Sequence, residues 1–463
     1  MMLHPDRLFP ADPATREIAR ALFAQVERLP IVSPHGHTDP RWWGEDPAFG
    51  SPAALLVVPD HYLCRMLVSR GVPFAALGIG PGAETDPRAI WRNFAAHYHL
   101  FRGTPSRLWF DHALETVFGI TARLSPETAD ATHDAIAERL AEPAFRPRAL
   151  YDRFGIEVIA TTDAATDDLG WHAMVRGSGW RGRVVPTYRP DGVTDPDMPG
   201  FRAEVERLGA LTGCDIGTWE GYLAAHRARR AFFKAMGATA TDHGHPTPQT
   251  ADLPGAEAAA LYQAVLGGRA TAAERETFRA QMLTEFARMS VEDGLVMQLH
   301  PGAIRNHSPH VLAHYGRDRG FDIPQPVSFT AALAPLLAAV GMDPRLTLIL
   351  FTLDETTYAR ELAPLAGAYP SLLLGPPWWF HDSVEGIRRF RQSVTETAGF
   401  MNTAGFNDDT RALCSIPARH DLSRRVDCAY LAELVTTHRL DEDEAHELAP
   451  LLANGLARAA YRL

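Results

Sequence analysis

Short apolar runs recur along the chain, and each has the length of one buried strand. They are rich in Val, Ile, Leu and Ala, which is typical of strands that are covered on both faces in a parallel sheet. Eight such runs predict strands, at residues 29–34, 156–162, 183–188, 237–242, 294–300, 346–352, 371–375 and 400–406.

Helical patterns separate most of these runs. Their apolar residues recur with the spacing of one helix face, at residues 201–211, 221–237, 274–290, 328–341 and 382–400. The fourth of these helices has Ser328 as its expected N-cap and Gly341 as its expected stop. Strands that alternate with helices predict an α/β fold with a parallel sheet covered by helices. Eight such units favour a closed (β/α)8 TIM-type barrel over an open sheet.

One long segment interrupts this alternation. Residues 41–152 lie between the first and second predicted strands and are too many for an ordinary strand-to-helix connection. The segment is rich in Trp and His and carries helical patterns at 61–72, 88–100 and 125–142. We therefore predict one domain over 1–463, with a mostly helical insertion at 41–152 after the first strand. Residues 420–463 predict two extra C-terminal helices.

Composition and charge restrict the partners of this chain. Its 463 residues are 46% hydrophobic and 22% charged, which suits a water-soluble globular protein. The net charge of −11 argues against nucleic-acid or anionic-membrane binding, because phosphate binding needs a basic surface. A few arginines in a cleft still permit a small anionic substrate.

The compartment is predicted from three further observations. The four cysteines are widely spaced and form no CxxC motif, so a zinc ribbon is excluded and free thiols in a reducing compartment are expected. The first residues lack a basic segment followed by an apolar run, and no apolar stretch of about 18 residues occurs. We expect a cytoplasmic protein without a membrane span.

Polar or aromatic residues follow nearly every predicted strand. Catalytic side chains of a barrel lie at the carboxyl ends of its strands, so these residues are candidates for one common site. In chain order they are His35 and His37, Thr162 and Asp163, Tyr188 and Arg189, Asp242 and His243, His300, Thr352 and Asp354, Trp378 and Trp379, and Asp408, Asp409 and Arg411.

The first predicted strand ends in a pair of histidines with one residue between them. Residues i and i+2 of a strand point to the same face, so His35 and His37 can aim both imidazoles at one ion. An Asp oxygen after the eighth strand can complete a catalytic site that keeps one position open. We expect one divalent ion, with zinc as the first candidate and manganese, iron or cobalt as alternatives.

The other histidines and the arginines extend this site. His243 and His300 directly follow strands, so we favour a metal or substrate role for them, whereas loop positions are expected for His245, His307 and His310. Arg189 and Arg411 also follow strands, and arginine binds carboxylates through two hydrogen bonds. The pair suggests an anionic substrate.

Several stretches resemble one known family. They are "SPHGHTDP" (33–40), "DHYLCR" (60–65), "TTDAATDDL" (161–169), "VPTYRPD" (185–191), "TDHG" (241–244), "MQLHPGAIRNHS" (297–308), "GPPWWFHDS" (375–383) and "DDTRALCSIPARHDLSRRV" (408–426). With these stretches in this order, the chain resembles the uronate isomerase (glucuronate isomerase) family of the amidohydrolase superfamily. The resemblance implies a metal-dependent barrel enzyme that interconverts D-glucuronate with D-fructuronate and D-galacturonate with D-tagaturonate, two aldose–ketose isomerisations of hexuronate catabolism.

The resemblance also implies residue roles. His35, His37 and Asp409 match the metal ligands, although the doubled acid "DD" leaves Asp408 as an alternative to Asp409. His61 and Tyr62 match a His-Tyr pair in the insertion. The remaining matches, which are expected to contact the substrate, are Arg189, Asp242, His300, Trp378, Trp379 and Arg411.

A proton transfer from C2 to C1 through an enediolate is the expected mechanism. Asp409 is the expected general base, and His61 and Tyr62 are expected to handle hydroxyl protons and the developing oxyanion. Arg411 would support negative charge, and Arg189 would hold part of the sugar acid.

Two other functions compete with the isomerase. Relatives with the same histidine pair are often hydrolases, and those with two metals bridge them through a modified lysine. The predicted fourth strand contains no lysine, since Lys234 lies upstream, which favours a mononuclear site. A non-catalytic sugar-acid binder is the second rival, but it would not need a full metal set. The preferred uronate, the native metal and any homo-oligomer stay open.

Overall fold

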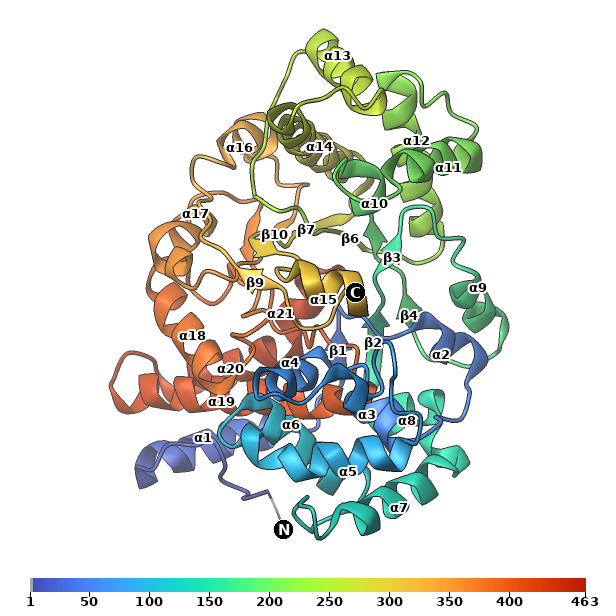
Figure 1. The fold of residues 1–463 in the computed structure, drawn as a ribbon. Helices are drawn as coiled ribbons and strands as arrows, with labels where there is room; N and C mark the ends of the chain where they lie inside the picture. The colour runs from blue at the N-terminus through green and yellow to red at the C-terminus, as the bar shows by residue number, and fades with distance from the viewer. Residues whose placement is uncertain (1–2) are drawn as a thin grey trace.

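Parallel strands form the centre of the fold (Figure 1). The computed structural model describes residues 3–463. Its parallel strands are β1 (Ile31–Ser33), β2 (Ile156–Ala160), β3 (Asp163–Ala164), β4 (Val184–Val185), β5 (Tyr188–Arg189), β6 (Ala240–His243), β7 (Val296–Leu299), β10 (Leu348–Leu350) and β11 (Leu372–Leu374). With helices packed around them, these strands make an α/β fold.

The strands pair in two sheets, with the orders β1-β2-β4 and β11-β10-β7-β6-β5-β3. β3 follows β2 along the chain, and β5 follows β4 in the same way. Backbone hydrogen bonds continue between the two pairs, since Thr161 N donates to Val185 O and Asp163 N to Thr187 O, each at 3.0 Å. If β2 with β3 and β4 with β5 are each counted as one strand position, the parallel strands lie side by side in chain order from β1 to β11.

The predicted eighth strand at 400–406 is wrong as a full strand. Only one isolated bridge, Leu374 to Thr403, occurs there among the described residues. The segment turns at once, because Thr403 N donates to Phe400 O and Gly405 adopts a φ of +73°. A residue in that left-handed region cannot continue an extended strand.

Helices of very different length cover the strands (Figure 1). They bury a large apolar core in which Tyr188, Met297 and Leu348 of the strands join Phe233 and Phe286 of the helices. The helices are α9 (Gly170–Gly177), α10 (Asp191–Thr194), α11 (Phe201–Thr212), α12 (Trp219–Ala235), α13 (Gly255–Leu266), α14 (Ala272–Asp293), α16 (Ala334–Val340), α17 (Ala363–Ala366) and α18 (Val384–Ala398), with a π-helical turn at Tyr358–Leu362.

The predicted helix at 328–341 is only partly correct. The helix α16 begins at Ala334 and ends before Gly341, as expected for its stop. Ser328 does not cap it, because the Ser328 hydroxyl instead donates to Glu361 Oε2 at 3.1 Å. A buried tertiary partner has displaced the local cap.

A helical segment follows β1. It buries its own apolar cluster, which includes Trp91, Phe94 and Phe101 and reaches Ile156 and Ile159 of β2. Its helices are α2 (Pro40–Glu45), α3 (Pro52–Leu56), α4 (His61–Ser69), α5 (Pro87–His97), α6 (Pro105–His112), α7 (Ala129–Leu140) and α8 (Pro147–Arg153), with shorter turns at Phe74–Leu77, Tyr98–Phe101, Ala113–Val117 and Pro143–Phe145.

A two-stranded antiparallel hairpin follows β7. It consists of β8 (Ala303–Ile304) and β9 (Ile323–Pro324), with α15 (Pro309–Tyr315) between them. The strands are only two residues long, so they leave no recognisable pattern in the sequence. The hairpin carries Arg305 and Asp318 towards the site described below.

The two ends of the described chain pack together. α1 (Pro13–Val26) lies against α19 (Ile416–Thr436) and α20 (Glu442–Pro450), and a turn at Leu413–Ser415 precedes α19. A π-helical turn at Leu451–Gly455 leads to α21 (Leu456–Ala460), so the second predicted tail helix is interrupted and the first begins before residue 420. Tyr461 Oη donates to Gln298 Oε1 of β7 at 2.9 Å, which ties the tail to the sheet.

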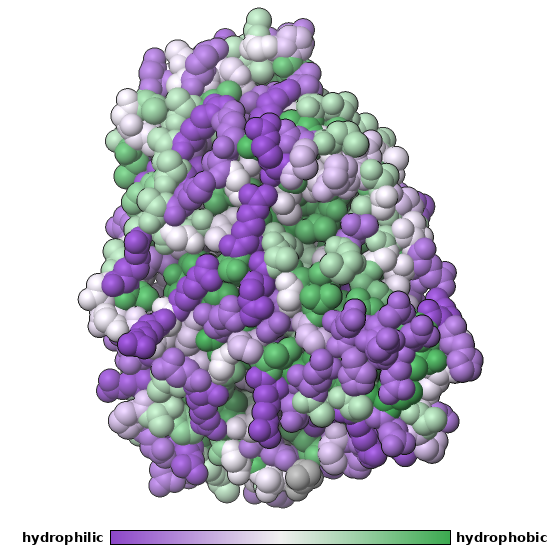
Figure 2. Space-filling view, turned by 180° about the vertical axis from the view of Figure 1, so that it is seen from behind, coloured by the Kyte–Doolittle hydropathy of each residue, from purple (hydrophilic) through white to green (hydrophobic). Residues whose placement is uncertain are grey.

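The surface mixes polar and apolar residues. Figure 2 shows hydrophilic side chains spread over one face of the molecule, with smaller hydrophobic patches between them. Within residues 3–463, none of the helices combines the length and the apolar character that crossing a membrane requires.

Candidate metal centre and surrounding polar network

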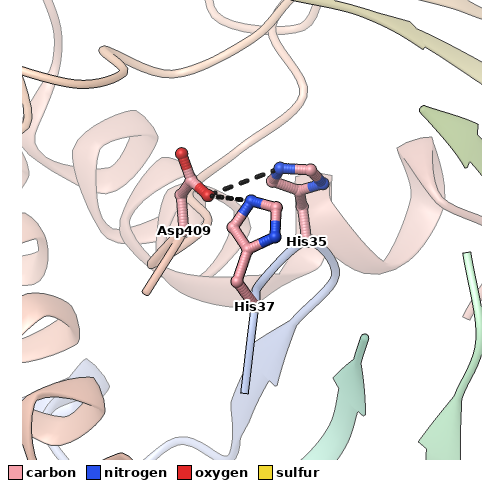
Figure 3. Close-up of side chains that lie close together, drawn as sticks. All are labelled: His35, His37 and Asp409. Atoms are coloured by element: carbon pink, nitrogen blue, oxygen red, sulfur yellow. Dashed lines mark ion pairs between the residues drawn. The ribbon is translucent and has the colours of Figure 1, made fainter. Parts of the chain in front are cut away.

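The side chains of His35 and His37, which follow β1, and of Asp409, which follows the Leu374–Thr403 bridge, converge on one point (Figure 3). Asp409 Oδ1 lies 3.4 Å from His35 Nε2 and 3.1 Å from His37 Nε2. His35 is 2% exposed, whereas His37 is 28% exposed, so the group opens on one side. Two imidazoles and one carboxylate with an open side are a donor set for a catalytic divalent metal.

The hydrogen bonding of this group fits a metal site. Asp409 Oδ1 and His35 Nδ1 are buried and have no hydrogen-bond partner among residues 3–463. Buried polar atoms are normally satisfied, so a carboxylate oxygen that faces two imidazole nitrogens without a hydrogen bond needs another partner. Although burial opposes ionisation, the two nearby imidazoles hold the pKa of Asp409 well below its usual range. Asp409 is therefore anionic.

Hydrogen bonds join the loop of His35 and His37 to the two neighbouring loops. His37 N donates to Thr410 O at 3.1 Å, and the Thr162 hydroxyl donates to Gly36 O at 2.9 Å. Asp409 itself has a φ of +37°, which is uncommon for a residue other than glycine. Strained residues of this kind cluster at functional sites, where the surrounding structure holds them in place.

The neighbouring acid points elsewhere. Asp408 Oδ2 lies 3.1 Å from His420 Nε2 of α19, and both side chains are buried. The structure thus places Asp409, and not Asp408, beside His35 and His37.

A second buried chain of polar groups lies behind His35. His300 Nδ1 is 2.7 Å from Asp242 Oδ1, and Arg189 Nη1 is 3.2 Å from Asp242 Oδ2. The His300 ring stacks on His35 with 4.7 Å between ring centroids, and His35, Asp242 and His300 form a second group of potential ligands. Arg189 also pairs with Asp191 at 2.8 Å, so two carboxylates already balance its charge.

His61 is held by a tryptophan from a distant loop. Trp379 Nε1 donates a hydrogen bond to His61 Nε2 at 2.8 Å. The acceptor nitrogen cannot carry a proton, so the proton of a neutral ring sits on Nδ1. Burial, with the charge of Arg411, lowers the pKa of His61 to about 3, which keeps the ring neutral. His61 is therefore a hydrogen-bond donor rather than a free base.

Tyr62 is held by the same loop. Its hydroxyl donates to Asp382 Oδ1 at 2.9 Å and accepts from Phe380 N at 3.2 Å. Asp60 caps α4 by accepting from Tyr62 N at 2.9 Å, which fixes the start of the helix and the His61–Tyr62 pair with it.

The hairpin after β7 supplies further charged groups. Asp318, with a φ of +60°, lies 3.2 Å from Arg411 Nη2. Arg305 pairs with Asp322 at 2.9 Å and lies over the ring of Trp379 at 5.1 Å. The neighbouring Trp378 is buried, and its ring meets His300 edge-on at 4.8 Å.

The remaining histidines lie outside the candidate ligand groups. His243 Nε2 lies 3.0 Å from the Thr241 hydroxyl and its ring packs on Phe286 at 4.8 Å. His243 therefore does not join the metal group, in contrast to the role favoured from its position after a strand. His310 lies in α15 and not in the expected loop, and its ring is tilted against that of His314 near the surface, with 4.2 Å between centroids.

Sequence reasoning missed Asp382 and Arg419. Both lie inside stretches that carry the family resemblance, "GPPWWFHDS" and "DDTRALCSIPARHDLSRRV", but neither follows a predicted strand directly. Both have polar or charged neighbours in the sequence, so apart from the resemblance no local signal distinguishes them.

Comparisons with known proteins agree along the whole chain. The sequence profile described as glucuronate isomerase matches residues 13–454. The uronate isomerase of Rhizobium meliloti (strain 1021) is 64% identical over 466 residues, which cover 100% of this chain and 99% of that protein. The crystal structure of glucuronate isomerase from Caulobacter crescentus superposes with a TM-score of 0.98 at 55% identity, covering 99% and 97% of the two chains. Uronate isomerase from Thermotoga maritima gives a TM-score of 0.93 at 28% identity, covering 100% of both chains.

Proposed function

The chain belongs to the glucuronate isomerase family, and we propose that it interconverts D-glucuronate with D-fructuronate and D-galacturonate with D-tagaturonate. Membership makes it a uronate isomerase. The observation that carries the reaction is the placement of His61 and Tyr62, which one loop holds in defined hydrogen-bonding states, together with the metal-ligand set of His35, His37 and Asp409.

We infer a closed (β/α)8 barrel as the scaffold. Strand positions follow chain order from β1 to β11, and the Leu374–Thr403 bridge supplies the eighth position. The bond from His37 N to Thr410 O joins the loops that follow the first and eighth positions. In this view residues 1–463 form one domain, and 41–152 is an insertion in it.

His35, His37 and Asp409 are proposed to hold one divalent ion. Their neutral nitrogens and one carboxylate suit zinc, and manganese, iron and cobalt accept the same donors. When bound, the ion supplies positive charge that orients substrate oxygens and stabilises developing negative charge. His300 and Asp242 support this centre from behind, since His300 stacks on His35.

Asp409 is proposed to move the proton. Its ionised carboxylate takes the proton from C2 of the open-chain sugar acid and returns it to C1, through an enediolate. Arg411 is 42% exposed, so its guanidinium can donate to substrate oxygens that gain charge. The lowered pKa keeps Asp409 ionised at neutral pH, as a general base must be, and the substrate and a bound ion would have to raise its basicity for the transfer.

The other residues are proposed to bind and orient the sugar acid. His61 donates through Nδ1–H, and the Tyr62 oxygen, whose proton is donated to Asp382, accepts from a substrate hydroxyl. Arg189 acts with Asp242 as a fixed ion pair at the wall of the site, because its charge is already balanced. His300, Trp378 and Trp379 complete that wall.

We propose a cytoplasmic enzyme of small sugar acids. In residues 3–463 the cysteines are free, which suits a reducing compartment.

One experiment tests the function against its rivals. The protein is incubated with D-glucuronate and with D-galacturonate, and the ketose is identified by NMR, with and without a chelator. We expect both ketoses and their loss after chelation. Hydrolysis of lactones or esters without isomerisation would favour a hydrolase, and binding without turnover would favour a sugar-acid binder.

A further inference from the structure

The loop after β11 contacts both members of the His61–Tyr62 pair. Trp379 donates to His61, and three residues later Asp382 accepts from Tyr62. Phe380 N also donates to the Tyr62 hydroxyl, and Phe380 has a φ of +66°, uncommon for an aromatic residue. A strained turn thus presents two side chains to two neighbouring residues of α4, which indicates that the loop is shaped around them.

Asp382 is itself held by a buried arginine. Arg419 Nη1 donates to Asp382 Oδ2 at 2.7 Å, and the side chains are 6% and 11% exposed respectively. The Arg419 guanidinium lies over the ring of Trp109 at 3.7 Å, and Trp109 packs edge-on against Tyr62 at 5.7 Å. The Tyr62 phenol is therefore held by its hydrogen bond to Asp382 and packs on Trp109, and Arg419 contacts both of these residues.

The same arginine reaches the loop that carries the metal ligand. Arg419 Nη1 also donates to the backbone oxygen of Asp408 at 3.1 Å. Asp408 directly precedes Asp409, which faces His35 and His37. One guanidinium consequently links the partner of Tyr62 to the backbone beside the proposed base.

We propose that Asp382 is a positioning residue for the isomerisation, which together with Arg419 holds the Tyr62 phenol at a fixed place relative to the Asp409 loop. The inference rests on the proposed function, because it requires Tyr62 to meet the substrate. A phenol attached through rotatable bonds would otherwise sample several positions. Holding reacting groups in one geometry is worth orders of magnitude in rate.

A double-mutant cycle of Asp382→Asn and Tyr62→Phe tests the proposal. If Asp382 acts through Tyr62, Asp382→Asn lowers kcat by on the order of 10–100-fold with little change in KM, as for other supporting residues. In the Tyr62→Phe background the same substitution then changes kcat by less than about threefold, because residues that act as a unit are not additive. Asp382→Glu, which keeps the charge, recovers part of the rate.

A matched control separates positioning from loss of a buried ion pair. Arg391 and Asp427 form a comparable buried pair between α18 and α19, at 2.7 Å and away from the site. We expect Asp427→Asn to lower the unfolding temperature as Asp382→Asn does, while kcat stays near that of the original protein. Circular dichroism and metal content are measured for every variant.

Three results would overturn the inference. One is additive losses in the cycle, and another is loss of bound metal from Asp382→Asn in proportion to its activity. The third is a Tyr62→Phe variant with an unchanged rate, which removes Tyr62 from the reaction but leaves the isomerase function intact. The unsubstituted protein reports on the proposed function separately, since a failure to convert either uronate would reject that function and the positioning role with it.

Discussion

Trp379, in the loop after β11, fixes the proton of His61 at one ring nitrogen. The indole N–H donates to His61 Nε2 at 2.8 Å, so the imidazole keeps its own proton on Nδ1. The two rings lie nearly perpendicular, at 84°, with 5.4 Å between their centroids. This arrangement makes one nitrogen of His61 unavailable to substrate and leaves the other as a donor.

Trp379→Phe should therefore impair catalysis more than folding. The substituted ring keeps most of the packing but loses the donor, so His61 can change tautomer or take up a proton at its freed Nε2. We expect kcat/KM to fall by about tenfold, the scale of other supporting residues, and the acid limb of the pH–rate profile to move to higher pH. Trp180→Phe, in the remote contact with Trp43, is the control and should keep its rate. An unchanged pH profile in Trp379→Phe would contradict this role of the indole.

The metal centre predicts a specific loss on substitution of one ligand. His37→Asn removes one of the three proposed protein ligands, so metal content per chain should fall well below that of the original protein. Since a ligand that binds only the folded state stabilises it, the chelator should also lower the unfolding temperature of the original protein and hardly affect the variant. Elemental analysis after dialysis and thermal unfolding provide the two readouts. Full metal occupancy in His37→Asn would count against this ligand set.

The two adjacent acids should behave differently. Asp409→Asn removes the proposed base and should lower kcat by about 10²–10⁴-fold. Asp408→Asn changes a side chain that pairs with His420, so it should lower stability and retain most of the bound metal. Rates and metal content are compared for both variants.

Proton transfer can be followed directly in deuterated water. Transfer by Asp409 allows exchange with solvent, so the product should carry deuterium at C1. A product free of solvent deuterium under all conditions would instead indicate a hydride shift between C2 and C1.

A buried acid away from the metal should make stability depend on pH. Burial raises the pKa of Asp163 to about 7, although a hydrogen bond from the Thr161 hydroxyl at 2.7 Å opposes the rise. The same hydroxyl lies 2.8 Å from His172 Nε2, so the three groups form one network. In the folded chain Asp163 is neutral below about pH 7, whereas in the unfolded chain it ionises near pH 4.

The sign of this effect follows from proton binding. Between about pH 4 and pH 7 the folded state binds more protons than the unfolded state, so stability falls as pH rises. The upper limit of the loss is about 4 kcal/mol for a shift of this size. Asp163→Asn cannot ionise, so the variant should gain stability relative to the original protein as pH rises from 4.5 to 7. Urea unfolding at both pH values measures the difference, and a constant offset would refute the assignment.

The sequence predicted the buried strands well for a physical reason. Parallel strands covered on both faces must be apolar, so the runs 294–300 and 346–352 were recognisable without any knowledge of their neighbours, and β7 and β10 lie within them. His35 and His37 were found because the pair directly follows such a run. The family resemblance then supplied His61 and Tyr62, which no local pattern singles out.

The failures share a cause, because each depends on contacts between distant segments. Ser328 was predicted as a cap from its position, but Glu361 offers it a buried partner. Residues 400–406 are apolar like a strand, yet the turn at Thr403 and Gly405 leaves one bridge. Asp382 and Arg419 form their hydrogen bonds to Tyr62 and to each other only when α4, α19 and the loop after β11 pack together.

The packing of these distant segments has a consequence for the order of folding. The hydrogen bonds that hold His61 and Tyr62 join residues that are 318 and 320 positions apart in the chain. Contacts of such sequence separation form late, because the intervening chain must first be ordered. Helices and most of the core can thus be present in a refolding molecule that does not yet turn over substrate. Enzymatic activity is then a reporter of the last stage of assembly, the docking of the first third of the chain onto the last.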